Sequence, residues 1–129
     1  MNLETLNENI RRHERLDRAY EMVESMRQKA GLHAVSLDGM PRGTDISDKV
    51  GSVAIAVADL MTKIEALEDA VEAGDNQIRD FANSLDDERT QMAVQLRFIS
   101  GLTWSKTADV LCLKSEDAAK RLVYRELDD

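Results

Sequence analysis

The chain has 129 residues, of which 33% are charged, 43% are hydrophobic and only 4% are aromatic, and its formal net charge is −8. This length fits a single domain, or a single domain with an extended appendage, and it excludes a large multidomain enzyme. The scarcity of aromatic residues argues against a β-sandwich or barrel, while the apolar fraction is too high for a disordered chain. The composition therefore predicts a helical, all-α protein.

Composition also excludes several kinds of functional site. A single cysteine, Cys112, excludes an internal disulfide, and together with two histidines it cannot supply the four ligands of a structural zinc ion. The sequence has no glycine-rich phosphate loop, no Ser/His/Asp set and no clustered carboxylate pair, so we expect neither an enzyme nor a cofactor. The acidic net charge confines any nucleic-acid contact to a local surface.

The N-terminal residues mix charged and polar side chains without the apolar core of a signal peptide. No stretch of the sequence approaches the ~20 apolar residues of a membrane span. We therefore expect a cytoplasmic protein with no membrane partner.

Residues 3–29 are expected to form one long amphipathic helix, because apolar residues recur there at helical spacing. Residues 30–44 hold three of the six glycines and the only proline, Pro41, so we expect a chain-reversal loop. Asp45 or Ser47 is expected to cap the helix that follows, by accepting hydrogen bonds from its first backbone N–H groups. The apolar positions of the first helix are Leu3, Leu6, Ile10, Leu16, Tyr20, Val23 and Met26.

The second predicted helix, of about 40 residues or ~60 Å, carries the most regular pattern in the sequence. Its alternating 3,4 seam is typical of a coiled coil, so we expect residues 1–84 to form a long antiparallel helical hairpin. The excess seam is expected to pack on the C-terminal helices or on a second copy of the chain, which would make a homo-oligomer. Gly74 marks either a bend or a break. The seam consists of Val50, Val53, Val57, Leu60, Ile64, Leu67, Val71, Gly74, Ile78, Phe81 and Leu85.

Residues 85–129 are expected to form three short helices, of which the first opens at Asp86-Asp87-Glu88. Thr103 and Ser115 are expected to cap the second and the third. Two short helices joined by a small turn and supported by a preceding helix are typical of a helix-turn-helix domain. The chain is thus divided into a hairpin at 1–84 and a helix-turn-helix domain at 85–129. The apolar stripe of the first short helix is expected to be Met92, Ala93, Leu96, Phe98 and Ile99.

Several short motifs carry a resemblance to known proteins. Leu96-Arg97-Phe98, Gly101-Leu102-Thr103-Trp104 and the closing segment 115–127 resemble the region-four helix-turn-helix of bacterial RNA polymerase sigma factors. Segments 37–43 (LDGMPRG) and 47–50 (SDKV) resemble the linker of a phage- and prophage-borne family of sigma-region-four-like proteins. The resemblance implies a long helical hairpin followed by a region-four-like domain. It also implies a role in phage transcription regulation through double-stranded DNA, RNA polymerase, or both.

The exposed face of the last helix is the expected DNA-binding surface, because Arg and Lys on a groove-bound helix reach guanine O6 and N7 as well as phosphates. Glu116 and Asp117, at the start of that helix, are expected to repel phosphates. Cys112 stands where the turn of region four usually has glycine. The alternative is that the basic residues form an ordinary solvated helix face. The expected DNA-binding residues are Lys106, Lys114, Ser115, Lys120, Arg121, Tyr124 and Arg125.

Two other functions fit the same pattern. One is a structural or packaging component of a phage, such as a small terminase-like subunit, and the other is a protein–protein adaptor with a vestigial helix-turn-helix. The remaining notable residues are expected to be structural. We expect His13 and His33 to lack a metal, Cys112 to be a small buried residue, and Trp104 to pack in the core of the C-terminal helices. The apolar stripes are expected to include Met22, Met26, Met61 and Met92.

Overall fold

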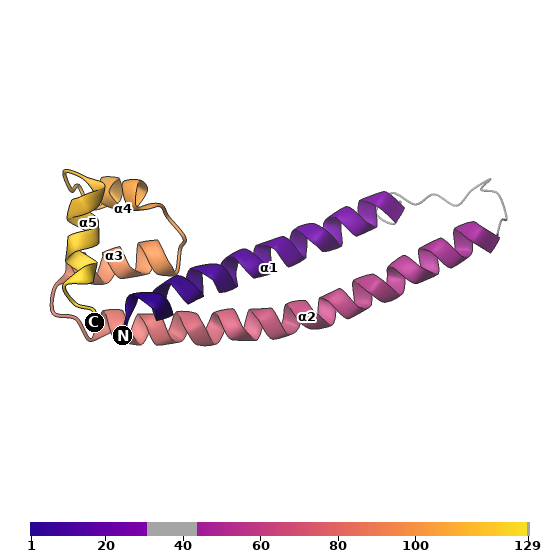
Figure 1. The fold of residues 1–129 in the computed structure, drawn as a ribbon, viewed down its shortest axis with the longest axis horizontal. Coiled ribbons are helices and arrows are strands. Elements are labelled where there is room, and N and C mark those ends of the chain that lie inside the picture. Colours follow the sequence, from indigo (N-terminus) through magenta and orange to yellow (C-terminus); the bar gives the residue numbers. More distant parts are fainter. Residues whose placement is uncertain (31–43, 129) are drawn as a thin grey trace. The chain divides into compact units, whose positions relative to one another are not determined.

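The computed structural model describes residues 1–30 and 44–128, with the side chains of residues 1–29 and 51–128. Over these residues the chain forms five α-helices and no β-strand, which confirms the all-α fold (Figure 1). The expected turn around Pro41 lies outside the described residues. The helices are α1 (Leu3–Ala30), α2 (Thr44–Asn83), α3 (Glu88–Phe98), α4 (Trp104–Val110) and α5 (Glu116–Tyr124).

The two long helices have the lengths that their apolar repeats predict, 28 residues for α1 and 40 for α2. α2 begins at Thr44. The cap expected at Asp45 or Ser47 concerns side chains that lie outside the described ones. α2 continues without interruption through Gly74, which excludes a break there.

The chain forms two compact units, unit 1 (Met1–Glu14 with Asp69–Asp129) and unit 2 (Arg15–Glu68). This grouping differs from the sequence-based division after residue 84, because the start of α1 and the end of α2 share a core with the C-terminal helices. A division by function, with a hairpin at 1–84 and a helix-turn-helix domain at 85–129, stays a prediction.

Unit 2 is a pair of helical segments, one from α1 and one from α2, that run in opposite directions (Figure 1). The Tyr20 hydroxyl donates to Glu68 Oε1 at 2.5 Å. This hydrogen bond, with a smaller effect of burial, raises the pKa of Tyr20 above its ordinary value of 10.0. The apolar core of unit 2 contains buried Ala19, Val23, Val57 and Ile64. The half-buried residues around them are Leu16, Met26, Val53, Leu60 and Leu67.

Not every residue of the predicted stripes is buried. Tyr20, Met22 and Met61 are exposed, because they lie beside the contact line between the helices and not in it. In the expected stripe of α3, Ala93 and Phe98 are buried, whereas Met92 is 50% exposed, so the expectation is wrong for Met92. Thr90, which was not expected in the stripe, is fully buried. The Thr90 hydroxyl donates to the Asp87 carboxylate at 2.7 Å, and this bond offsets the cost of burying the hydroxyl.

Unit 1 joins the start of α1, the end of α2 and all three short helices around one core. Ile78 is 1% exposed, and Phe81 packs against the same cluster, so the C-terminal helices cover the end of the α2 seam. This outcome confirms one of the two expected ways of covering the seam. The buried members of the core are Leu6, Ile78, Ala82, Ala93, Val94, Phe98, Leu111 and Val123.

Candidate nucleic-acid interface

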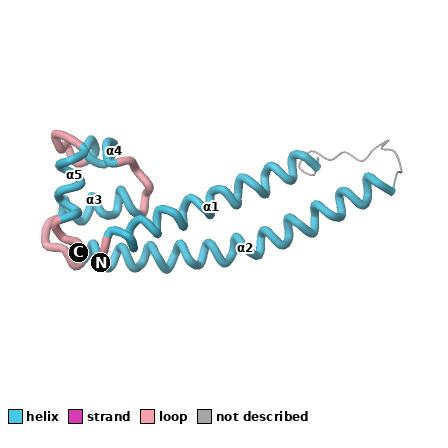
Figure 2. Tube along the Cα trace, in the orientation of Figure 1, coloured by secondary structure: helices cyan, strands magenta, loops and turns pink. Residues whose placement is uncertain are grey.

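α3, α4 and α5 pack against one another and are joined by short loops, as Figure 2 shows. The N-terminus of α3 is capped by Asp87, whose carboxylate accepts hydrogen bonds from the Thr90 backbone N–H at 3.2 Å and from its hydroxyl. These bonds, with the Thr90 hydroxyl contributing most, hold the pKa of Asp87 below its ordinary value of 3.8. The Arg125 guanidinium, 3.7 Å away, acts in the same direction.

The connection from α3 to α4 turns at Gly101, which has a φ of +77°. Leu102 N–H donates to the Leu96 carbonyl at 3.0 Å, and Arg97 Nη1 donates to the Leu102 carbonyl at 2.9 Å. The Arg97 guanidinium also lies 5.4 Å from the centre of the Trp104 ring, at cation–π distance. Arg97 therefore holds the loop between α3 and α4 in place.

Trp104 is half-buried between two other aromatic rings. Its ring centre lies 5.6 Å from that of Phe98 and 5.8 Å from that of Tyr124, both in edge-to-face geometry. Its place against the unit 1 core confirms the expectation of core packing. The contact also gives Tyr124, an expected DNA-binding residue, a structural partner on one side of its ring.

Both expected caps of the last two helices are present. Thr103 Oγ1 accepts from the Lys106 backbone N–H at 3.1 Å, and Ser115 Oγ accepts from the Ala118 backbone N–H at 3.2 Å. These bonds satisfy N–H groups that a helix start leaves without an intrahelical partner. The Ser115 hydroxyl oxygen is thus engaged at the start of α5.

The turn between α4 and α5 is a Schellman motif. Leu113 N–H donates to the Ala108 carbonyl at 2.9 Å, and Cys112 N–H donates to the Asp109 carbonyl at 3.2 Å. Cys112 has a φ of +56°, the left-handed conformation that glycine usually adopts at this position. Its side chain is exposed, so the expectation of a small buried residue is wrong. A residue at the left-handed position of such a turn points away from the core that its neighbours Leu111 and Leu113 contact.

α5 buries one side and exposes the other. Ala119 and Val123 are fully buried, whereas Arg121 on the opposite side is exposed and Lys120 is half-buried. Lys106 on α4 and Lys114 in the turn are exposed as well. Among the described residues, no ion pair holds any of these four cations.

Arg125 differs from the other expected cations. Its guanidinium lies 3.7 Å from Asp87 and 3.7 Å from Glu126, so it forms two exposed ion pairs. Of the seven expected residues, Ser115, Tyr124 and Arg125 therefore have structural contacts, whereas Lys106, Lys114, Lys120 and Arg121 form no ion pair with the described residues.

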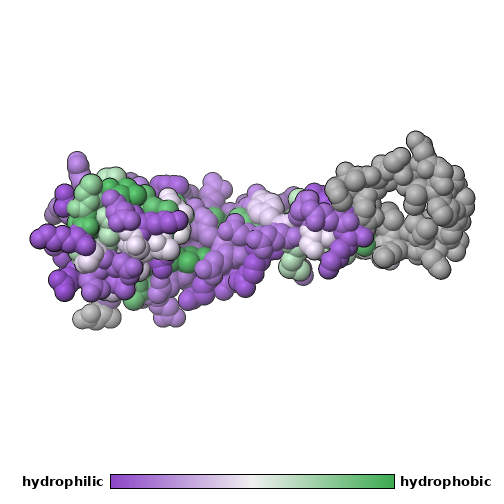
Figure 3. All heavy atoms as spheres, turned by 90° about the horizontal axis from the view of Figure 1, so that it is seen from above, coloured by the Kyte–Doolittle hydropathy of each residue, from purple (hydrophilic) through white to green (hydrophobic). Residues whose placement is uncertain are grey.

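The surface around the turn is not uniformly polar. Val110 at the end of α4 is 54% exposed, and Cys112 follows it in the turn. Figure 3 shows apolar side chains gathered over this end of unit 1. A nucleic acid on this surface would therefore meet apolar contacts as well as lysines.

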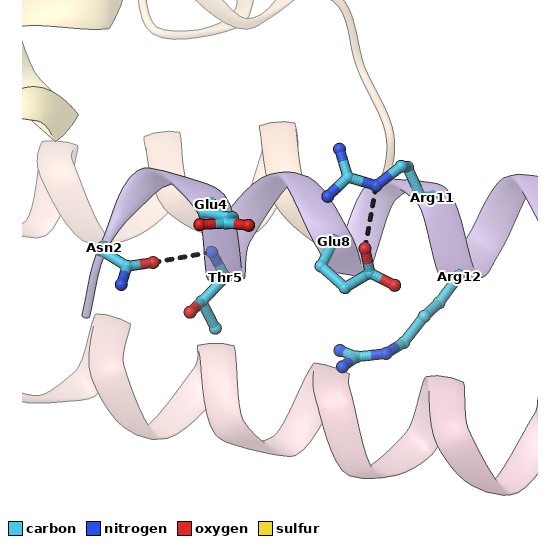
Figure 4. Close-up of a pocket in the computed structure, with 6 residues that line it drawn as sticks. All are labelled: Asn2, Glu4, Thr5, Glu8, Arg11 and Arg12. Carbon is cyan, nitrogen blue, oxygen red and sulfur yellow. Dashed lines mark hydrogen bonds and ion pairs between the residues drawn. The ribbon is translucent and has the colours of Figure 1, made fainter.

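A depression on the surface of α1 in unit 1 carries both signs of charge, as Figure 4 shows. Arg11 Nε donates to Glu8 Oε2 at 2.9 Å, and the Thr5 backbone N–H donates to the Asn2 side chain at 2.8 Å. The opposite charges offset one another, so this depression favours neither an anion nor a cation. Its lining residues are Asn2, Glu4, Thr5, Glu8, Arg11 and Arg12.

Sequence reasoning missed one polar cluster altogether. His13 was expected only to lack a metal, and the sequence did not predict that its Nε2 would lie 2.8 Å from Asp75 Oδ1. Asn9, fully buried beside it, donates to the same Asp75 oxygen at 2.9 Å. The available signal was the polar residue Asn9 inside an apolar stripe, combined with a glycine in the seam of α2.

Over the described parts of the chain, no group of three His, Cys, Asp or Glu side chains is placed to hold a metal ion. Within the same residues no helix combines the length and the apolar character needed to cross a bilayer. No protein-family model, curated protein or solved structure matches this chain. Its function is therefore inferred from its own sequence and structure.

Proposed function

We propose that this protein is a cytoplasmic, phage-type transcription regulator that binds double-stranded DNA through α5, alone or together with RNA polymerase. The proposal combines the resemblance of residues 88–127 to sigma region four with the packing of α3, α4 and α5. A short helix held by a tight turn on a small helical support is the arrangement that places a helix in the major groove.

The observation that carries the proposal is the two-sided character of α5. Ala119 and Val123 anchor the helix in the unit 1 core, and Lys120 and Arg121 project from its other sides without ion pairs in the described residues. Side chains in this position can contact base edges and phosphates without loosening the fold.

The acidic residues at the start of α5 restrict which part of the helix can approach DNA phosphates. Glu116 and Asp117 are exposed in the first turn of α5, where they interact favourably with the helix dipole but repel phosphates. The attraction must then come from cations on the flanks, which are Lys106 and Lys114, and from Lys120 and Arg121 further along α5. Glu116→Gln with Asp117→Asn is expected to tighten nonspecific binding by removing this repulsion.

Fluorescence anisotropy with a labelled duplex at low salt tests the proposal. The double variant Lys120→Ala with Arg121→Ala is expected to lose roughly 10- to 100-fold in affinity, since base and phosphate contacts are both removed. Arg79→Ala is the matched control for loss of a surface cation. Arg79 is exposed on α2, where its Nη1 donates to Asn76 Oδ1 at 3.1 Å, and its removal should leave the affinity within about twofold.

Absence of duplex binding by the wild type and by the acidic-to-amide variant would refute direct DNA binding by this chain alone. A repeat with RNA polymerase and promoter DNA then separates the two parts of the proposal. If polymerase also fails to recruit the protein to DNA, an adaptor or a packaging component becomes the better description.

A further inference from the structure

The core of unit 1 contains one fully buried polar side chain that links three helices. Asn9 of α1 is 0% exposed, and its Nδ2 donates to Asp75 Oδ1 of α2 at 2.9 Å and to the Phe98 carbonyl at the end of α3 at 2.8 Å. The His13 ring adds a further contact to the same Asp75 oxygen. The Asn9 amide therefore donates one hydrogen to Asp75 and the other to Phe98, which fixes the orientation of its side chain.

Gly74 makes room for this side chain. A Cβ built on Gly74 would overlap Asn9 Oδ1 and would lie 2.9 Å from Arg12 Nη1. Glycine in a helix interior costs about 1 kcal/mol relative to alanine, so its presence here needs a compensating role. Close approach of the Asn9 carboxamide to the α2 backbone is that role.

The pair Asn9 and Gly74 is not optimised for stability. Asn9 Oδ1 is buried and accepts no hydrogen bond from the described residues, which is unfavourable for a polar atom removed from water. A buried asparagine in a helix pair is known to specify alignment at a cost in stability. The remaining described seam positions of α2 are apolar, so they offer Asn9 no comparable partner.

We propose that Asn9 and Gly74 form a register lock between α1 and α2. If the helices slid by one turn, Asn9 would face Val71 or Ile78 in place of Gly74, and its amide would lose Asp75. The same shift would free the Phe98 carbonyl, so the lock also fixes the end of α3. The inference does not depend on DNA binding.

Thermal unfolding of the full chain, followed by circular dichroism, tests the coupling of the two residues. Gly74→Ala is expected to lower the melting temperature by roughly 5–10 °C through the clash with Asn9. Asn9→Ala with Gly74→Ala removes the clash and gains helix propensity, so it should melt near or above the wild type. Gly51→Ala is the matched control, because a Cβ at this exposed α2 glycine meets nothing within 4 Å, and it should raise the melting temperature by about 2–4 °C.

The register itself is measured by double electron–electron resonance. Spin labels at Glu4→Cys and Glu72→Cys, in a Cys112→Gly background, report the spacing between exposed positions of α1 and α2. The wild-type pair should give one distance. The Asn9→Ala, Gly74→Ala pair should add a second population at a different distance, because a slip of one turn moves one helix by about 5 Å along the other.

Three results would overturn the register lock. The first is a Gly74→Ala variant that melts at or above the wild type, because the glycine would then be merely a weak point in α2. The second is a double variant that melts no higher than Gly74→Ala. The third is a double variant that keeps the single wild-type distance, because the apolar seam alone would then fix the alignment.

Discussion

Replacing Cys112 with glycine should stabilise the protein. Cys112 occupies the left-handed position of the Schellman turn between α4 and α5, with a φ of +56°. A residue with a Cβ is strained in this conformation, whereas glycine is not. Because the Cys112 side chain is exposed, its removal sacrifices little apolar burial.

The magnitude follows from two opposing effects. Relief of the left-handed conformation contributes about 1–2 kcal/mol. The greater freedom of glycine in the unfolded chain costs about 0.4–1 kcal/mol. The net stabilisation is about 0.5–1 kcal/mol, which corresponds to a rise in melting temperature of about 2–4 °C for a chain of this size.

Gly101→Ala is the inverse test at the other turn. Gly101 has a φ of +77°, and a Cβ there meets nothing within 4 Å, so backbone strain alone should destabilise this variant by about 1 kcal/mol. Urea unfolding of wild type, Cys112→Gly and Gly101→Ala gives the three free energies. A destabilising Cys112→Gly together with a neutral Gly101→Ala would refute the assignment of strain to these turns.

Three further predictions concern caps and titrating groups. Thr103→Ala and Ser115→Ala should each cost about 1 kcal/mol in urea unfolding, since each removes a bond to a helix N–H group, and neutral results would contradict the capping roles. Asp87 has a folded-state pKa below its ordinary value of 3.8, so its contribution is complete above that value and is lost as the pH falls through the folded pKa. Stability measured from pH 6 to pH 2 should accordingly fall less in Asp87→Asn than in the wild type, and equal slopes would argue against the cap. Tyr20 has a raised pKa, so its contribution is present below pH 10 and is lost at higher pH. Absorbance titration of the phenols should show a later transition in the wild type than in Glu68→Gln, and coincident curves would exclude the hydrogen bond.

Much of the helical framework was predictable because the seam of α2 repeats with a strict spacing. Val57, Ile64, Val71 and Ile78 lie one heptad apart, and all four are buried. Such positions return to the same side of a helix, where each can pack against an apolar partner. The caps Thr103 and Ser115 were predictable for a similarly local reason, since a cap acts on residues two or three positions later.

Features that depend on contacts between distant segments were not predictable. The burial of Asn9 on α1 depends on Gly74 and Asp75 of α2 and on Phe98 of α3, which meet it only after three helices have packed. The ion pair between Arg125 and Asp87 likewise connects the end of α5 with the start of α3. Periodicity describes which side of a helix is apolar, but it does not identify the polar residue that another helix will contact.

For the candidate site, the sequence predicted which helices carry the cations but did not separate unpaired cations from paired ones. Lys120 and Arg121 lie on the accessible part of α5, as expected, whereas Arg125 contacts two carboxylates. The distinction requires the positions of Asp87 and Glu126 in space.

The salt dependence of duplex binding tests the central claim most directly. If Lys106, Lys114, Lys120 and Arg121 contact phosphates, the logarithm of the association constant should fall against the logarithm of salt concentration with a slope of about −3 to −4. Replacing any one of these four cations with alanine should flatten this slope by about one unit, and Arg79→Ala should leave it unchanged. Wild-type binding whose slope is unaffected by removing any of the four cations would contradict DNA recognition through α5 and its flanks.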